Sequence, residues 1–401
     1  MRRAVLIFGL IAAVGCTTDT PGTSVARDSA GITIIENVAT PAVPEVTGEL
    51  QLSIGVEEGP LEYQFYRVTG LARLTDGRIV VGEAESGRLR WFDAEGQLLL
   101  QAGGRGSGPG EFRYISAVVP MPNDTVAVWG GLLDPVSIFD SMGVFVRQEP
   151  LDRGRIADLV GPGRITEGLS PLPDGSFVLQ VLETREGPAP IGQVYRPPLE
   201  YHRVSRDYAT VDTLGQYGGF PQVFVDVGRA QPTPAVLDFP VHARLSAGGT
   251  PLQIYAGDGD RFEVHTFDSN GSLNHIIRLD SESRPVGAED LEMARGQTLE
   301  WAEREGREAE MERIFAALPK PTEFPAYDAL QASSEGGIWV RSWVAPTDSL
   351  AMWYVFDVSG SLQERVSLPS TFSPHQIGDS WVLGVERDSL EVERVRMYRI
   401  Q

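Results

Sequence analysis

Two stretches of this chain are near copies of each other, and a repeat of this kind strongly limits the possible folds. IGVEEGPLEYQF at 54–65 is followed by VTGL at 68–71 and LTDGRIVV at 74–81. AGGRGSGPGEF at 102–112 is followed by ISAV at 115–118 and MPNDTVAV at 121–128. A self-similar unit of this length, made of short strands and tight turns, predicts a β-propeller or a β-solenoid.

Tight turns before apolar runs mark the repeats along the whole chain. Asn, Asp and Gly tolerate the positive φ that two-residue hairpin turns need. The turns are Asp76-Gly77, Asn123-Asp124, Asp174-Gly175, Gly248-Gly249, Gly336-Gly337 and Gly378-Asp379. Counted between Gly77, Asp124, Gly175, Gly249, Gly337 and Asp379, the gaps are 47, 51, 74, 88 and 42 residues. A four-stranded blade takes roughly 40–50 residues. The gaps therefore predict an all-β, six-bladed propeller in which the two long gaps carry insertions.

The last predicted blade has only three strands before the chain reaches Gln401. Residues 50–54 precede the first blade, and in the repeat register they form an outer strand. We expect this N-terminal strand to pair with 392–400 and to close the ring, which hides sheet edges that would otherwise aggregate. A further strand is predicted at 31–36, with no assigned neighbour.

The repeat motifs resemble bacterial six-bladed β-propellers of the NHL-repeat type. The residues that carry this resemblance are DGRIVV at 76–81, LRWFD at 89–93, the loop at 103–112 and IFD at 138–140. The C-terminal half is similar to a family of lipid-anchored propellers through FPAY at 324–327, GGIWV at 336–340 and VERVRMY at 392–398. The resemblance implies the fold over residues 48–401. It does not imply one activity, because propellers host both enzymes and binding proteins.

The N-terminus has the pattern of a secretory signal. Arg2 and Arg3 precede an apolar run at 4–14 and then Gly15-Cys16, which resembles a bacterial lipobox. We expect a signal peptide at 1–15, lipidation of Cys16, a flexible tether at 16–30 and a single propeller domain at 31–401. By resemblance to known lipoprotein sorting rules, Thr17 in place of Asp implies the outer membrane, facing the periplasm or the exterior. An ordinary export signal with a chance cysteine is the alternative.

The charge and cysteine content narrow the classes of partner. Cys16 is the single cysteine, so no internal disulfide can form. The formal net charge is −21, and removal of Arg2 and Arg3 leaves 32 basic against 55 acidic residues, or −23. This charge repels nucleic acid and anionic lipid, so we expect no nucleic-acid partner and membrane contact through the lipid anchor alone. Solubility of an exported protein is a sufficient alternative explanation of the charge.

Long insertions are predicted to gather on one face of the propeller, because they fall between strands two and three or between blades. These segments are 103–114, 149–165, 183–199, 215–241 and 280–327. Loops on a rigid scaffold are where binding usually occurs. Residues near the strand entries on this loop face are candidates for ligand contact, namely Tyr66, Arg67, Tyr114, Arg164, His242, Tyr327 and His375.

One insertion has a helical pattern. Residues 288–318 are rich in Glu, Arg, Ala, Leu and Met, with Glu300/Arg304 as an i,i+4 pair. Gly296 and Gly306 weaken the run and could split it. The insertion is predicted either to cover the channel mouth as a lid or to pack on the propeller rim.

Motifs for catalysis are few. No Gly-x-Ser-x-Gly elbow, phosphate loop or zinc spacing occurs in the sequence. We therefore expect a non-catalytic binding protein with no cofactor and no metal, whose partner is a protein, a peptide or a glycan. The alternative is a calcium-dependent hydrolase or lactonase, for which Asp238 and Asp328 are the nearest acidic candidates. A structural role in an envelope complex is a third possibility.

Overall fold

The computed structural model describes residues 24–40, 42–132, 134–185, 187 and 190–400. The predicted signal peptide and Cys16 lie outside the described residues. The described part is mostly β, with many small sheets, the α-helices α1 (Arg153–Val160), α2 (Ala288–Arg304) and α3 (Glu308–Ala317), and the 3-10 turns Leu61–Tyr63 and Pro122–Asp124. None of these helices is long and apolar enough to cross a membrane.

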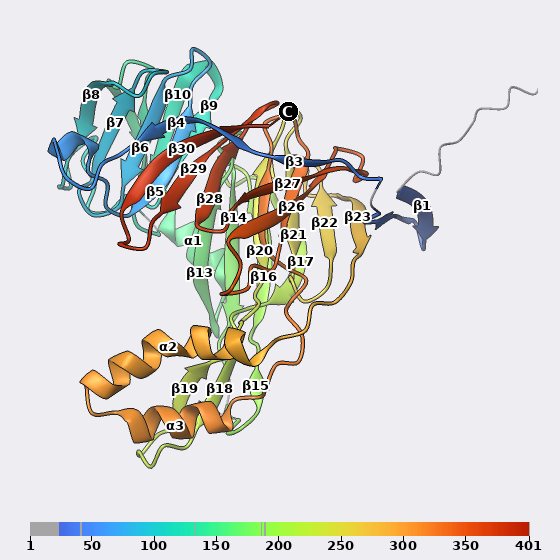
Figure 1. Ribbon diagram of the computed structural model, residues 1–401. Coiled ribbons are helices and arrows are strands. Elements are labelled where there is room, and N and C mark those ends of the chain that lie inside the picture. Colours follow the sequence, from blue (N-terminus) through green and yellow to red (C-terminus); the bar gives the residue numbers. More distant parts are fainter. Residues whose placement is uncertain (1–23, 41, 133, 186, 188–189, 401) are drawn as a thin grey trace, which may run out of the picture.

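Six sheets of the described part share one plan, in which four strands pair antiparallel with their neighbours (Figure 1). Sheet 1 holds β5 (Val68–Arg73), β6 (Ile79–Glu83), β7 (Arg88–Phe92) and β8 (Leu98–Gly103). Sheet 2 holds β9 (Ala117–Met121), β10 (Thr125–Trp129), β11 (Val136–Phe139) and β12 (Phe145–Glu149). Sheet 3 holds β13 (Arg164–Pro171), β14 (Phe177–Glu183), β16 (Pro198–Val204) and β17 (Val211–Gly218).

The second half of the chain repeats this plan. Sheet 4 holds β20 (Arg244–Gly248), β21 (Gln253–Gly257), β22 (Glu263–Phe267) and β23 (Leu273–Asp280). Sheet 5 holds β24 (Tyr327–Ala332), β25 (Ile338–Ser342), β26 (Leu350–Phe356) and β27 (Leu362–Pro369). Sheet 6 holds β28 (Phe372–Ile377), β29 (Trp381–Arg387) and β30 (Glu393–Arg399), and its fourth strand is β4 (Glu49–Ile54). The pairing of β4 with β30 is the one that the repeat register predicts.

Apolar clusters join neighbouring sheets. Sheets 1 and 2 pack through Trp91 and Phe139, whose ring centroids lie 6.2 Å apart. Comparable clusters join sheets 3 and 4, 4 and 5, 5 and 6, and 6 and 1. Between sheets 2 and 3 the contact is made by Leu151 and Leu169, beside helix α1. The fold is therefore propeller-like, with each sheet packed between two others.

Helix α1 was not predicted from the sequence, which indicated a helix only at 288–318. Asp152 caps it by accepting a hydrogen bond from the Arg155 amide, and only Ile156 and Val160 are buried. Two buried residues over eight positions give too weak a periodic signal to separate a short helix from a loop. The helix fills the space beside sheet 3.

The segment before β4 contains more strands than the sequence predicted. The second half of the expected tether forms β1 (Ser24–Ser29), which pairs with β2 (Ile32–Val38). Strand β2 runs parallel to β23, and β3 (Glu45–Thr47) runs parallel to β27. The chain therefore lines the outer edges of sheets 4 and 5 before it enters sheet 6.

Three insertions build a separate unit below the sheets in Figure 1, which we call the insertion module. It consists of a three-stranded sheet, β15 (Val194–Tyr195), β18 (Gln222–Val225) and β19 (Thr233–Val236), with helices α2 and α3. Val223 and Ala235 share a buried cluster with Ile314 and Leu318. The helical run is split at Gly306, whose φ of +64° is left-handed. Helix α3 therefore packs on a sheet made by the other two insertions, an arrangement that neither the lid nor the rim prediction anticipated.

Asn37 provides a test of how the N-terminal segment is held. Its side chain is 1% exposed, donates to the carbonyls of Arg278 (3.0 Å) and Gly360 (3.1 Å), and accepts from the Leu362 amide (2.9 Å). We expect Asn37→Ala to lower the free energy of unfolding by about 2 kcal/mol or more, because a buried group left unpaired costs about 1–3 kcal/mol. Urea denaturation measures this loss.

The matched control is Asn274→Ala, since Asn274 is exposed and bonds only to Gln253. Its effect should stay within about 0.5 kcal/mol. Equal effects of the two substitutions would show that Asn37 does not tie sheets 4 and 5 together.

Candidate binding site

A groove of about 790 Å³ lies where the insertion module meets sheet 5. One wall is β19 with the residues after it, a second is the facing sides of α2 and α3, and the third is the link between β25 and β26. The residues that line it are Pro234–Pro240, Ala294, Arg295, Thr298, Trp301, Met311, Ile314, Phe315, Trp343–Pro346, Asp348 and Ser370. All three walls come from links on the predicted loop face, but only two of the five predicted insertions, 215–241 and 280–327, contribute residues to this groove.

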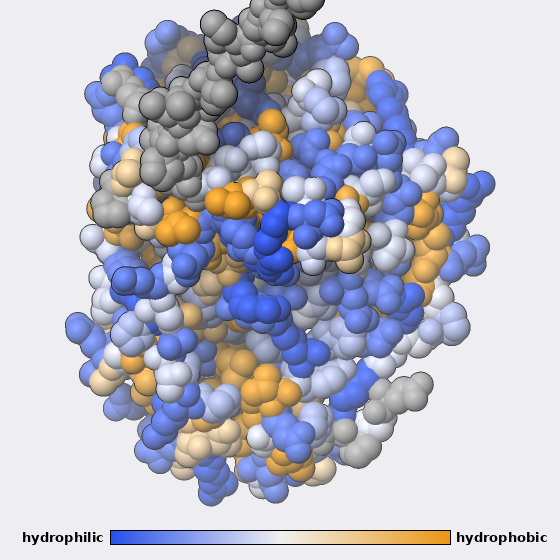
Figure 2. Space-filling view, turned by 90° about the vertical axis from the view of Figure 1, so that its right-hand side faces the viewer, coloured by the Kyte–Doolittle hydropathy of each residue, from blue (hydrophilic) through white to orange (hydrophobic). Residues whose placement is uncertain are grey.

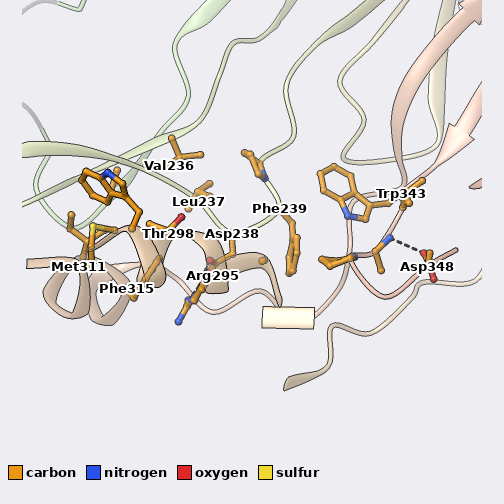
Figure 3. A pocket seen from close by; sticks show the side chains of 18 of the residues that line it. Val236, Leu237, Asp238, Phe239, Arg295, Thr298, Met311, Phe315, Trp343 and Asp348 are labelled. Atoms are coloured by element: carbon orange, nitrogen blue, oxygen red, sulfur yellow. Dashed lines mark hydrogen bonds and ion pairs between the residues drawn. The ribbon is translucent and has the colours of Figure 1, made fainter. Parts of the chain in front are cut away.

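Phe239 stands at the centre of the groove. In Figure 3 its ring lies between the helical end, marked by Met311 and Phe315, and Trp343 at the other end. The ring centroid is 6.3 Å from that of Trp343 and 4.8 Å from that of Phe324. Its φ is +55°. A left-handed backbone is rare for a bulky residue and costs about 1–3 kcal/mol, and such strain clusters at functional sites.

An ion pair fixes one wall of the groove to another. Arg295 on α2 donates from Nε to Asp238 Oδ1 at 2.9 Å, and the Asp238 side chain is only 5% exposed. The hydrogen bond from Arg295 to Asp238 raises the pKa of the guanidinium, which also lies 4.7 Å from the Phe315 ring centroid. The charges of Arg295 and Asp238 therefore neutralise each other, and the surface that remains for a ligand is largely apolar and aromatic.

The module also exposes apolar side chains outside the groove. Viewed from the side on the right of Figure 1, apolar residues gather toward the lower part of the molecule, where the module lies, within a mostly hydrophilic surface (Figure 2). Exposed apolar side chains of the module that do not line the groove include Ile191, Val194, Met293 and Leu299. Strand β19 pairs with β18 on one edge, and its other edge has no strand partner among the described residues.

Three of the predicted ligand-face residues lie together, away from the groove. Arg67 has a φ of +55°, donates to Glu85 at 2.8 Å and lies 5.8 Å from the Tyr114 ring centroid. Tyr66 beside it is 67% exposed. Arg164 lies apart from them on β13 and is held by Glu200, which also bonds His202 at 3.0 Å.

The remaining predicted residues point in different directions. Tyr327 is completely buried, donates to the Glu263 carbonyl at 3.0 Å and packs on Phe262, so it cannot contact a ligand on the loop face. His375 lines a cavity of about 310 Å³ to which the first strands of all six sheets contribute, and which extends toward the tight-turn ends of those strands. His242 lines a different cavity, between sheets 3 and 4.

The acidic residues named for calcium do not form a calcium site. Asp238 is bound by Arg295, and Asp328 accepts from Arg341 Nε at 2.6 Å. Calcium takes roughly 6–8 oxygen ligands. Within the described ranges, no group of three or more His, Cys, Asp or Glu side chains is placed to hold a metal ion. Neither of the two named acids is therefore free to bind the calcium that the hydrolase alternative requires.

Of the groove residues, only Asp238 was named as a site candidate from the sequence, and it was named for calcium. The segments 215–241 and 280–327 were located as insertions, but their pairing depends on contacts between residues far apart in the chain. PTPAVLDFP at 232–240 contains the available signal, because an apolar run bounded by prolines is unusual in an exposed loop. That pattern does not indicate which other segment covers it.

No protein-family model and no curated protein matches this sequence. Among solved structures, a member of the DUF4221 family from Bacteroides vulgatus aligns with 90% of this chain and 99% of its own, at 10% identity and a TM-score of 0.50. An exported protein from Bacteroides fragilis aligns with 89% of this chain and 99% of its own, at 11% identity and a TM-score of 0.43. A gluconolactonase from Xanthomonas campestris aligns with 88% and 98%, at 10% identity and a TM-score of 0.40. Identities this low inform the fold alone, and the likeness supports a propeller-type arrangement of small sheets.

The Asp238–Arg295 pair gives a test of how the module is held. Because the carboxylate is buried, we expect Asp238→Asn to leave Arg295 without its counter-charge and to loosen α2 from the segment after β19. Amide exchange in Ala288–Arg304 should accelerate by at least about tenfold, while the six sheets stay protected. Asp280→Asn is the matched control, since Asp280 is exposed. Equal exchange in the two variants would contradict this assignment.

The two histidines that line cavities, His375 and His242, predict that the stability of the fold falls between pH 6.5 and 4. Burial and the charge of Arg387 lower the pKa of His375 to about 4 from 6.5, and burial with Arg244 and Arg196 lowers that of His242 to about 4. The unfolded chain therefore takes up protons near pH 6.5, and the folded chain only near pH 4. The free energy of unfolding should fall as the pH drops through this window. The loss should reach about 1–3 kcal/mol per histidine.

Urea denaturation between pH 4 and 8 measures the slope. His375→Gln should make the profile shallower below pH 6.5 and run parallel to the wild type above it. A profile with the wild-type slope in that window would mean that His375 protonates as readily in the folded chain.

Proposed function

We propose that this chain is a six-bladed β-propeller, closed by β4, that binds an extended peptide segment of a partner protein in the groove. Six four-stranded sheets, the place of β4 in sheet 6 and a cavity reached by the first strand of every sheet support the propeller. The predicted lipidation of Cys16 would hold it at the cell envelope, with the loop face free to meet its partner.

The groove is the observation that carries the proposal. Ligand pockets of about 300–1,000 Å³ with apolar and aromatic walls are typical binding sites, and this groove has about 790 Å³. Phe239, Trp343 and Phe315 supply rigid aromatic surface, the residue type that anchors most partner segments.

Backbone groups favour a peptide over a glycan. The free edge of β19 faces no other strand in the described part of the chain, and the backbone groups of 237–239 form no hydrogen bond with any described residue. Trp343 Nε1 is a buried donor that no described residue accepts. An extended peptide satisfies such groups by adding a strand while its side chains enter apolar pockets.

The two carboxylates of the groove are both engaged by arginines, which favours binding over chemistry. Asp238 is held by Arg295, and Asp348 accepts from Arg284 Nη2 at 2.8 Å. Burial acts in the opposite direction, but the hydrogen bonds from Arg284 and the Ala345 amide hold the pKa of Asp348 below its usual range. Neither carboxylate is free to act as a general base at neutral pH.

The proposal is tested by selection from a displayed library of random 12-residue peptides against the purified chain. The selected peptides are then synthesised and titrated by fluorescence polarisation. Trp343→Ala should weaken binding by at least about tenfold, as expected for an aromatic anchor. Trp343→Phe keeps an aromatic ring, although a smaller one, and removes the Nε1 donor, so binding should weaken several-fold. This milder substitution also tests whether the effect of Trp343→Ala comes from misfolding.

Tyr66→Ala is the matched control, because Tyr66 is an exposed aromatic residue outside the groove. Methylation of alternate peptide amides should abolish binding if a strand is added to β19. Loss of binding in Tyr66→Ala with full binding in Trp343→Ala would move the site away from the groove. A library that yields no binder, or selected ligands that bind both variants as tightly as the wild type, would overturn the proposal.

A further inference from the structure

A second cavity, of about 510 Å³, lies between sheets 3 and 4 and has a polar character that the groove lacks. Its walls come from β13, β14 and β16 on one side and from residues 242–245, which lead into β20, on the other. The chain from Phe239 in the groove reaches this cavity within a few residues, but no residue lines both sites.

Tyr201, a mostly buried residue, lines the cavity wall. The residue is 1% exposed, and its hydroxyl forms no hydrogen bond with any residue of the described part. Burial raises the pKa of Tyr201, so the hydroxyl stays protonated and can donate. The hydroxyl can therefore donate to a group that enters the cavity.

His242 and Arg244 add two further donors beside it. Arg244 Nη1 donates to His242 Nε2 at 3.0 Å, and since arginine can only donate, the neutral ring carries its proton on Nδ1. Burial, together with the charges of Arg244 and Arg196, lowers the pKa of His242 to about 4, so the ring is neutral at physiological pH. His242 Nδ1 and Arg244 Nε are both buried without a hydrogen-bond partner in the described residues.

The charge of Arg244 is not balanced by a carboxylate. Within the described residues no acidic side chain lies at ion-pair distance from Arg244. Burial lowers the pKa of Arg244 and the charge of Asp328 opposes this shift, but Asp328 itself is paired with Arg341. Arg164 on β13 is paired with Glu200, and Arg196 with Asp258 at 3.0 Å. A half-buried guanidinium without its anion is unfavourable, so the cavity attracts an anionic group.

The opposite wall carries a free carboxylate. Glu167 is the unpaired residue of a β-bulge between Thr166 and Gly168, which turns its side chain out of the regular alternation of β13. It is exposed and forms no ion pair or hydrogen bond with the described residues. Leu182, Leu199 and Phe220 provide apolar surface in the same cavity.

We propose that this cavity binds a small zwitterionic α-amino acid. Arg244, Tyr201 and His242 hold its carboxylate, Glu167 faces its ammonium group, and the apolar wall receives its side chain. Three donors without acceptors match one carboxylate, and the single free acid matches one ammonium group. This binding is independent of the peptide proposed for the groove.

The test is isothermal titration calorimetry of the purified chain with each of the twenty L-amino acids. Acetate and n-butylamine serve as probes that carry one charge each. We expect at least one amino acid to bind more tightly than either of them. Arg244→Gln should weaken that binding by at least about tenfold and Tyr201→Phe by several-fold, because hydrogen bonds to a charged group are among the strong ones.

Glu167→Gln should weaken binding of the amino acid and leave binding of acetate unchanged. Arg88→Gln, an exposed arginine outside the cavity, is the matched control and should bind as the wild type does. Tyr201→Phe removes only an atom that has no partner, so its melting temperature should stay near the wild-type value, which separates binding from folding.

Two results would overturn the proposal. The first is the absence of binding by all twenty amino acids, or binding that Arg244→Gln and Tyr201→Phe leave unchanged. The second is binding of acetate as tight as that of every amino acid, with no effect of Glu167→Gln, which would reduce the site to one for simple anions.

Discussion

Backbone pairing between β4 and β30 joins strands from opposite parts of the chain and gives sheet 6 its fourth strand. The pairing places Ile54 in the cluster that sheet 6 shares with sheet 1, beside Phe65 and Val395. Without it, sheet 6 would end at β30 with an open edge, and the apolar face of sheet 1 would lose its neighbour.

Arginine pairs then decide what each site can recognise. Inside the sheets, Glu83 and Arg90 form a pair at 3.0 Å with both side chains about 5% exposed, so charge is buried only with its partner. The groove follows this rule through Asp238 and Arg295, which leaves apolar contact and backbone groups as its means of recognition. The cavity is an exception to this rule, because Arg244 has no carboxylate partner among the described residues. Charge is therefore its means of recognition. The two proposed sites therefore differ in the kind of ligand that each would recognise.

The sheets could be predicted from the sequence because their signals are local. Each tight turn and the apolar run after it lie within about ten residues, and both survive the insertions. The directions of single side chains could not be predicted, because the first strands carry bulges that reset the period-2 alternation. The pairing skips one residue in β5, β13, β24 and β28, at Thr69, Glu167, Asp328 and His375. Tyr327, next to one bulge, is buried in the core, whereas His375, itself at a bulge, lines the cavity reached by all six sheets.

The insertion module could not be predicted from the sequence, for a different reason. Its sheet takes β15 from within sheet 3 and β18 and β19 from the link to sheet 4, and its helices come from the link to sheet 5. No single insertion holds an apolar core of its own, so Val223 and Ile314 become buried only when two insertions meet. The module is held through its own cluster and the pair of Asp238 with Arg295, while the sheets pack through other clusters. Residues of the groove can therefore change with little effect on the sheets, which is the condition under which a repeat scaffold acquires a binding site.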